Sequence, residues 1–313
     1  MSIIIHCFLQ VRSSGERSSI GTSGANRCMI TEEVSLDDKI LFGIKILKGT
    51  IKPHNVTLKG GNSFTEKIQC DLEIENDIEE DARIAFMKNF VRFLTFFISQ
   101  YEENPQNGFT YFEVDWLTYH SYKPNEGRYA PYHTTMKMTM TSVITWDAIQ
   151  WDATVIDEYI DVIFNNYYNG IKTNDFKSKY FHWFLILEAI EKSDAYKRAF
   201  AARLFDKIEL EDIAKKFKTG DAKYNAIMNL KDRLMLPRKE RLYKMLLKMG
   251  VQTYRSFEED VTLSVDTVEK IIRYRNELFH EGGANDEWFV WRHLFPIVRT
   301  VIELLMKNPN LLK

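Results

Sequence analysis

The chain has 313 residues, of which 45% are hydrophobic and 27% are charged, and its formal net charge is −2 at pH 7. These values are typical of a globular chain with room for about two domains, and they exclude a uniformly basic nucleic-acid-binding protein. The charge is divided unevenly: residues 1–150 hold 15 Lys+Arg against 19 Asp+Glu, net −4, and residues 151–313 hold 27 against 25, net +2, which together give −2.

The sequence does not indicate a membrane-spanning, secreted or disulfide-rich protein. The longest apolar run, around residues 90–98, contains Arg92 and is shorter than the roughly 20 residues that span a bilayer. The first residues lack the basic segment and small-residue cleavage site of a signal peptide. Cys7, Cys28 and Cys70 are widely spaced and form no CxxC pair. We therefore expect a cytoplasmic protein without disulfides, metal site or cofactor.

Residues 1–146 are predicted to form an α+β domain. Segments rich in β-branched and aromatic residues alternate there with polar positions, which predicts strands at 3–11, 40–46, 56–58, 68–74, 111–119 and 134–144. One helix is predicted from about Ile78 to Tyr101, because apolar residues recur at steps of three and four positions. The expected fold is a mostly antiparallel sheet with one packed helix.

Residues 147–313 are predicted to form an all-α domain, because the apolar period changes near Trp146 from two to about 3.6. Pro237 and Gly250 are placed to begin and end one helix. Asp266 with Glu269 resembles a capping box, and Pro296 is expected to kink the last helix. The helices are predicted at 154–168, 177–193, 196–206, 209–217, 222–234, 237–249, 265–280 and 286–306.

The stretch most informative about function lies at the end of the helix predicted over 265–280. Arg275 and Asn276 are followed, after three further residues, by His280. Five helical steps place Arg275 and His280 roughly 140° apart, so the two side chains do not stack on one face. They can share a site if the helix bends near Gly282 and Gly283, or if the same helix of a second copy approaches across a two-fold axis.

This motif resembles that of the HEPN superfamily, an all-α fold whose active members are metal-independent ribonucleases that act as dimers. Arg275-Asn276-x-x-x-His280 matches the R-polar-x-x-x-H form of its RX4–6H motif. The stretch 180–191, with Leu187-Glu188-Ala189, is similar to the first core helix of the Apea-like HEPN group. The resemblance covers roughly residues 154–306, and in that group a sheet-rich domain precedes the HEPN domain.

The residue types suit the chemistry that the resemblance implies. RNA cleavage without a metal needs a group that deprotonates the ribose 2′-OH and a group that stabilises charge on the phosphorane. His280 titrates near neutrality and can act as base or acid, and Arg275 offers a fork of donors to phosphate oxygens. Asn276 could orient the phosphate or His280, and Glu188 or Glu191 could hold Arg275 by an ion pair. Alternatively, Arg275 is a structural ion-pair partner and His280 bonds the last helical carbonyls.

A cluster of basic residues also points to RNA. Residues 214–248 contain 11 Lys and Arg against three acids, a local net charge of +8. Such clustering suits a surface that follows a phosphate backbone, although a solvated helix face would have the same pattern. The RNA-binding residues expected from this segment are Lys215, Lys216, Lys231, Arg233, Arg238, Lys239 and Arg241.

Aromatic residues in the second half have two interpretations. They could stack on nucleobases, but packing in the core or between domains is favoured. The positions concerned are Trp146, Trp151, Tyr167, Tyr168, Trp288 and Trp291.

Together these features predict a cytoplasmic endoribonuclease that forms a homodimer through its HEPN domain. The resemblance further implies a prokaryotic defence or toxin effector, with an N-terminal sensing or regulatory domain and an inhibitory or activating protein partner. The rival interpretation is a catalytically inactive HEPN module that serves for dimerisation or partner binding.

Overall fold

The computed structural model describes residues 2–14, 27–57, 63–75, 78–99, 109–124, 141–144, 158–201, 207–230, 236–257, 259–280 and 286–313. The chain forms two compact units, Met1–Ile186 and Leu187–Lys313, and the division falls within helix α3 (Phe176–Lys192). The domain boundary expected between residues 146 and 147 lies outside the described residues.

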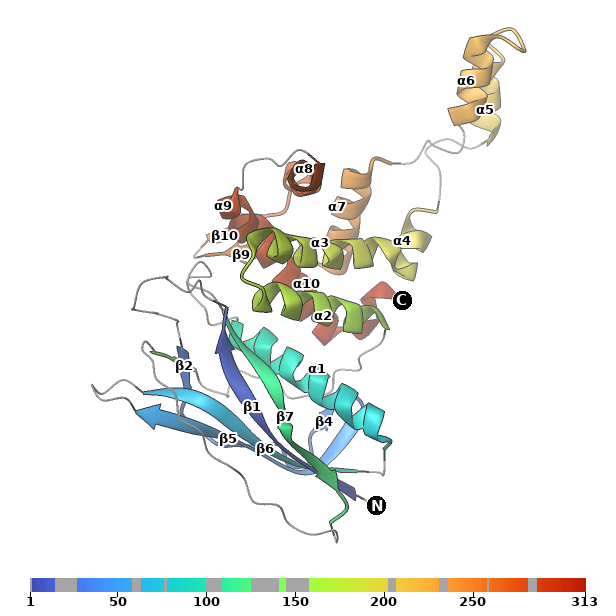
Figure 1. The fold of residues 1–313 in the computed structure, drawn as a ribbon. Helices are drawn as coiled ribbons and strands as arrows, with labels where there is room; N and C mark the ends of the chain where they lie inside the picture. The colour runs from blue at the N-terminus through green and yellow to red at the C-terminus, as the bar shows by residue number, and fades with distance from the viewer. Residues whose placement is uncertain are drawn as a thin grey trace. The chain divides into compact units, whose positions relative to one another are not determined.

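An antiparallel sheet with strand order β3–β5–β6–β1–β7 organises the first unit, and β4 pairs with β5 (Figure 1). Alternate residues of β1, namely Ile3, Ile5, Cys7 and Leu9, are buried on one face, as the period-two pattern predicts. A short parallel pair joins β2 (Arg27–Ile30) to β8 (Thr141–Ile144). The sheet strands are β1 (Ser2–Ser13), β3 (Val34–Ser35), β4 (Ile40–Leu41), β5 (Ile44–Thr57), β6 (Ser63–Glu75) and β7 (Thr110–Tyr122).

Helix α1 (Glu80–Ser99) packs against β7 and against α2 (Glu158–Lys172). Glu80 and Asp81 in its first turn complement the helix dipole, and Phe90, Phe93 and Phe96 are buried among its core-facing residues. The predicted antiparallel sheet with a packed helix is therefore confirmed.

Two predicted strands belong largely to one strand of this sheet. The segments 40–46 and 56–58 were expected to be separate strands, but β5 is continuous over Ile44–Thr57 and includes Pro53. Pro53 pairs with Ile68 of β6 and lies beyond the part of β5 that pairs with β3. Its missing N–H therefore breaks no bond to β3.

The second unit is mainly helical, as predicted. Pro237 precedes α7 and Gly250 ends it with a left-handed φ of 106°, which confirms the expected signals. None of the helices in the described ranges is long and apolar enough to cross a membrane. Its elements are the end of α3, α4 (Asp194–Ala199), α5 (Lys207–Ala214), α6 (Ala222–Leu230), α7 (Arg238–Met249), β9 (Thr253–Ser256), β10 (Glu259–Thr262), α8 (Val265–His280), α9 (Glu287–Phe289), the π-helical turn η3 (Val290–Leu294), α10 (Phe295–Lys307) and the 3₁₀ turn η4 (Pro309–Leu312).

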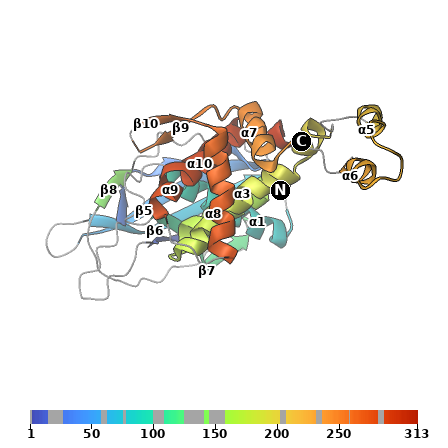
Figure 2. The same ribbon diagram turned by 90° about the horizontal axis from the view of Figure 1, so that it is seen from above.

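An antiparallel hairpin, β9–β10, interrupts the helices and corrects the all-α expectation. Tyr254 and Ser256 of β9 are buried in alternation with exposed neighbours. The hairpin lies beside α10 and η3 (Figure 2). This strand pairing is local, and its four-residue strands were too short to stand out from the surrounding helical periodicity.

One predicted helix signal is corrected, and the structure shows what happens at Pro296. Ser264, not Asp266, caps α8, because its hydroxyl oxygen accepts a hydrogen bond from the backbone N–H of Thr267 at 3.1 Å. Pro296 directly follows the π-helical turn η3, in a helical backbone that continues from α9 through η3 into α10. The helix expected over 286–306 therefore departs from regular α geometry just before Pro296, the residue whose missing N–H and ring disturb a helix.

Candidate functional site

Helix α8 carries the predicted motif and has the predicted bounds, Val265–His280. Val268, Ile271, Tyr274 and Leu278 are buried at steps of three and four residues and fix which face of the helix is turned inward. Helix α7 packs against α8, and the ammonium group of Lys239 lies 2.8 Å from the carboxylate of Glu269. The orientation of the motif is thus set by core packing on its own helix.

Arg275 and Asn276 lie toward the outside of this helix. Asn276 is exposed and Arg275 is half-buried. Nη1 of Arg275 donates a long hydrogen bond, 3.4 Å, to Oδ1 of Asn276. His280 is the last residue of α8, and its side chain lies outside the described part of the structure.

A buried tyrosine adjoins the motif. Burial raises the pKa of Tyr274 to about 12. Its ring packs against that of Phe289 in α9, with centroids 6.1 Å apart. Tyr274 therefore remains neutral near pH 7 and joins the motif helix to the segment that follows it.

The acidic pair of α3, Glu188 and Glu191, contacts Arg238 at the start of α7. Arg238 donates from Nε and Nη2 to the two carboxylate oxygens of Glu191, at 2.8 and 2.5 Å, and Nη2 lies 3.6 Å from Glu188. The hydrogen bonds to Glu191 raise the pKa of Arg238. The guanidinium of Arg238 thus lies beside both carboxylates, and the ion pair expected between Arg275 and Glu188 or Glu191 stays a prediction.

This arrangement also changes the role of Arg238. Its bidentate contact to Glu191, whose side chain is only 13% exposed, connects the start of α7 to α3. Arg238 was expected to bind RNA, but its guanidinium already faces two carboxylates inside the second unit.

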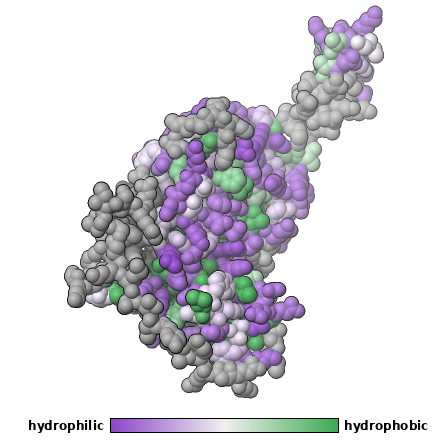
Figure 3. Space-filling model, viewed as in Figure 1, coloured by the Kyte–Doolittle hydropathy of each residue, from purple (hydrophilic) through white to green (hydrophobic). Residues whose placement is uncertain are grey.

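The other expected RNA-binding residues have varied surroundings. Lys215 contacts Asp212 at 2.7 Å, Lys239 contacts Glu269, and the guanidinium of Arg241 lies over the ring of Tyr196. Lys216 is exposed in the turn after α5, where α5 and α6 show a largely hydrophilic surface (Figure 3). Lys231 and Arg233 lie outside the described residues.

The aromatic residues of the second half divide between core and surface. Tyr167 and Trp291 are buried, which agrees with the packing interpretation. Trp288 is instead 50% exposed and stacks on Phe257, which is 39% exposed, with ring centroids 4.9 Å apart. Sequence reasoning missed Phe257 because it missed the hairpin that carries it. Trp146 and Trp151 lie outside the described residues.

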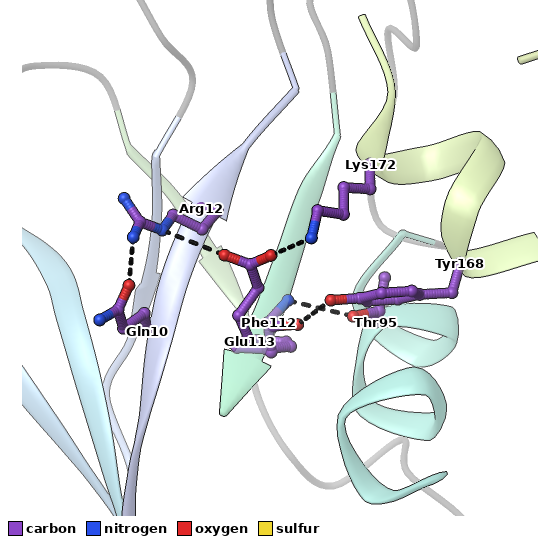
Figure 4. Close-up of polar contacts among 7 residues, drawn as sticks. All are labelled: Gln10, Arg12, Thr95, Phe112, Glu113, Tyr168 and Lys172. Carbon is purple, nitrogen blue, oxygen red and sulfur yellow. Dashed lines mark hydrogen bonds and ion pairs between the residues drawn. The ribbon is translucent and has the colours of Figure 1, made fainter. Parts of the chain in front are cut away.

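Helix side chains cover the free edge of β7 in the first unit, next to a charged cluster around Glu113. Glu113 lies between Arg12 of β1 and Lys172 of α2 (Figure 4). At the neighbouring residue, the hydroxyl of Tyr168 donates to the Phe112 carbonyl at 2.7 Å, and Thr95 accepts from the Phe112 N–H at 3.1 Å. Backbone groups that an edge strand would leave open are thus bonded by helix side chains, which is a structural role.

A second polar network crosses the face of this sheet that also carries Glu113, opposite the face with the buried residues of β1. His6 bonds Asp71, Gln69 donates to Asp71 at 2.7 Å, and a ring nitrogen of His54 lies 3.2 Å from the Gln69 oxygen. Burial favours a raised pKa for Asp71, but the hydrogen bonds from His6 and Gln69 lower it overall. No group of three or more His, Cys, Asp or Glu in the described ranges is arranged to hold a metal ion.

No family model, curated protein or solved structure matches this chain. The case for a function therefore depends on the residues and their geometry.

Proposed function

We propose that this protein is a metal-independent endoribonuclease of the HEPN type, with Arg275, Asn276 and His280 as its catalytic residues. The observation that carries the proposal is the placement of the motif on α8. The buried residues of this helix leave Arg275 and Asn276 on its outer side, and the helix ends at His280.

In the proposed reaction, the ribose 2′-oxygen attacks the adjacent phosphorus and the bond from phosphorus to the 5′-oxygen breaks. The 2′-hydroxyl proton passes to a base, and a proton is delivered to the leaving 5′-oxygen. His280 supplies this acid–base function, and Arg275 donates to the phosphorane oxygens. The products are a 2′,3′-cyclic phosphate and a 5′-hydroxyl end.

A homodimer satisfies the geometry of this mechanism. Because Arg275 and His280 are five residues apart on one helix, their side chains diverge by roughly 140° within a single chain. A second α8 that approaches across a two-fold axis supplies the complementary residue on each side. Dimerisation through the second unit is thus part of the proposal, as are RNA as substrate and a regulatory partner that restrains cleavage.

The proposal is tested by cleavage of single-stranded RNA in EDTA with the wild type, Arg275→Ala and His280→Ala. We expect the wild type to produce cyclic phosphate ends and the two variants to lose at least 100-fold in rate, the order of magnitude associated with removal of an acid–base group. Size-exclusion chromatography must show the same oligomeric state for all three proteins.

Two outcomes contradict the assignment. Cleavage that is absent from all three proteins favours the rival, a HEPN module that serves only for dimerisation or partner binding. Cleavage that is equal in all three assigns the activity to other residues or to a contaminant.

A further inference from the structure

We infer that the stacked pair Phe257–Trp288 is a platform for a nucleobase of single-stranded RNA. This inference deepens the proposed ribonuclease function and rests on it. It assigns a binding role to Phe257, directly after β9, and to Trp288 in α9, neither of which belongs to the catalytic motif.

The exposure of the pair is its first unusual feature. Trp288 and Phe257 are among the few large hydrophobic residues of the described chain that face solvent, and their rings are nearly parallel, at 13°. Each ring covers one side of the other, and substantial aromatic surface remains open. Offset parallel stacking is the arrangement by which aromatic side chains also accept nucleobases.

The backbone of Phe257 is the second unusual feature. Its φ is +53°, in the left-handed region that a bulky residue adopts only with strain. Glycine or asparagine would suit this turn between β9 and β10 better. Strained conformations of this kind cluster at functional sites. The strain and the exposed ring at one residue together favour a role in binding over a role in folding alone.

Contacts between rings place the pair near the catalytic motif. Trp288 precedes Phe289, whose ring contacts Tyr274, and Tyr274 precedes Arg275 on α8. An ion pair of 3.3 Å between Arg292 and Glu259 connects η3 to the hairpin. The platform and the motif are thus connected through Phe289 and Tyr274, and the inference is that one RNA chain contacts both.

The charges around the platform indicate how it binds. Arg292 contacts Glu259, and Arg255 lies 4.0 Å from Asp260. In these two described pairs each cation is matched by a carboxylate, so the pairs themselves add no excess positive charge to attract phosphates. Binding at the platform should come from stacking, and it should require unpaired bases, since the bases of a duplex already stack on one another.

The test measures binding of a fluorescent single-stranded RNA octamer with 2′-O-methyl groups at every position, which cannot be cleaved by 2′-OH attack. Trp288→Ala should weaken binding by about tenfold or more, because stacking on one aromatic residue contributes this much. Trp288→Phe should retain most of the affinity. The matched control is Trp116→Ala, which removes a tryptophan of similar exposure, 45%, from the first unit.

A second readout separates binding from folding. Phe257→Asn removes the ring, but asparagine suits the left-handed backbone. The melting temperature of this variant should therefore equal or exceed that of Phe257→Ala. Both variants should bind the octamer more weakly than the wild type. A ring that served only to pack the hairpin would give the opposite pattern, with lower stability and unchanged affinity.

The inference is overturned if the wild type does not bind the octamer, or if Trp288→Ala binds as tightly as Trp116→Ala. It is also overturned if an abasic octamer binds as tightly as the one with bases. Its failure is distinguishable from failure of the ribonuclease proposal. If Trp288→Ala cleaves RNA with normal kinetics, only the platform inference is contradicted. If the wild type binds the octamer in a base-dependent way but cleaves no RNA, only the ribonuclease proposal is contradicted.

Discussion

At the scale of single residues, the most unusual charged group is Lys179 of α3. It is only 6% exposed, and its ammonium group donates to the carbonyls of Gly170 and Ile171 at the end of α2, at 3.3 and 3.4 Å. A cation at a helix C-terminus complements the dipole. Burial nevertheless outweighs this interaction and lowers the pKa of Lys179 to about 8.

This depressed pKa predicts a specific pH dependence. Below pH 8 the folded and unfolded chains both hold the proton, and the buried charge costs about 3 kcal/mol. Between pH 8 and about 10.5 the folded state loses the proton while the unfolded state keeps it, so that stability rises with pH. The free energy of unfolding of the wild type relative to Lys179→Met should therefore increase by about 2–3 kcal/mol from pH 7 to pH 10 in urea titrations. Lys177→Met, on the same helix, should follow the wild type at each pH, and a difference that stays constant with pH would contradict the burial argument.

At the scale of elements, a glycine determines how closely α2 approaches α3. A Cβ added at Gly170 would lie 2.3 Å from Nε1 of Trp183, whose ring is fully buried. Alanine in a helix normally stabilises it by about 1 kcal/mol relative to glycine. Here the clash should reverse the sign, and we expect Gly170→Ala to destabilise the protein by about 1–3 kcal/mol in chemical denaturation.

A double-mutant cycle isolates this contact. Trp183→Phe removes Nε1, the atom that the new methyl group would approach most closely, so Gly170→Ala should be less harmful in that background. Asn169→Ala, one residue earlier in α2, adds helix propensity without the clash and should be close to neutral. An equal effect of Gly170→Ala in both backgrounds would show that backbone conformation, not the tryptophan, is responsible.

The sequence predicts elements best where one periodicity extends over many residues. The bounds of α8 agree with the prediction, because four buried residues at steps of three and four define its face. The hairpin β9–β10 was missed because each strand has only four residues and the turn between them carries Phe257 at positive φ instead of Asn-Gly.

The candidate site was predictable only in part, for a related reason. A local motif on one helix can be read from spacing, and so the sequence places Arg275 and Asn276 on α8. The pairing of Arg238 with Glu191 joins positions 47 residues apart, and the stack of Phe257 on Trp288 joins a hairpin to a helix. Such contacts depend on tertiary packing, and helical or strand periodicity does not encode them.

At the scale of the whole molecule, the net charge of −2 includes a basic segment of +8 over residues 214–248. Within it, Lys215, Arg238 and Lys239 contact carboxylates, and therefore they neutralise protein charge before any ligand is bound. Lys216 and Lys218 are exposed between α5 and α6. These two lysines are the better candidates for contacts to RNA phosphates.

This distribution predicts different salt dependences for two kinds of variant. If Lys216 and Lys218 each contact one phosphate, Lys216→Glu with Lys218→Glu should weaken binding of the 2′-O-methyl octamer. It should also reduce the slope of log K against log salt concentration by about 1.4, since each contact to single-stranded RNA contributes about 0.7. Trp288→Ala should lower affinity without changing the slope, because it removes stacking and no charge.

The control for the charge reversal is Lys48→Glu with Lys88→Glu, which makes the same change in net charge at two exposed lysines of the first unit. If binding depends only on total charge, the two double variants will shift affinity and slope equally, and the basic segment has no specific role. If phosphates follow the α5–α6 turn, only the first double variant will flatten the salt dependence. The slope therefore separates a localised phosphate contact from long-range attraction, which bare affinity does not.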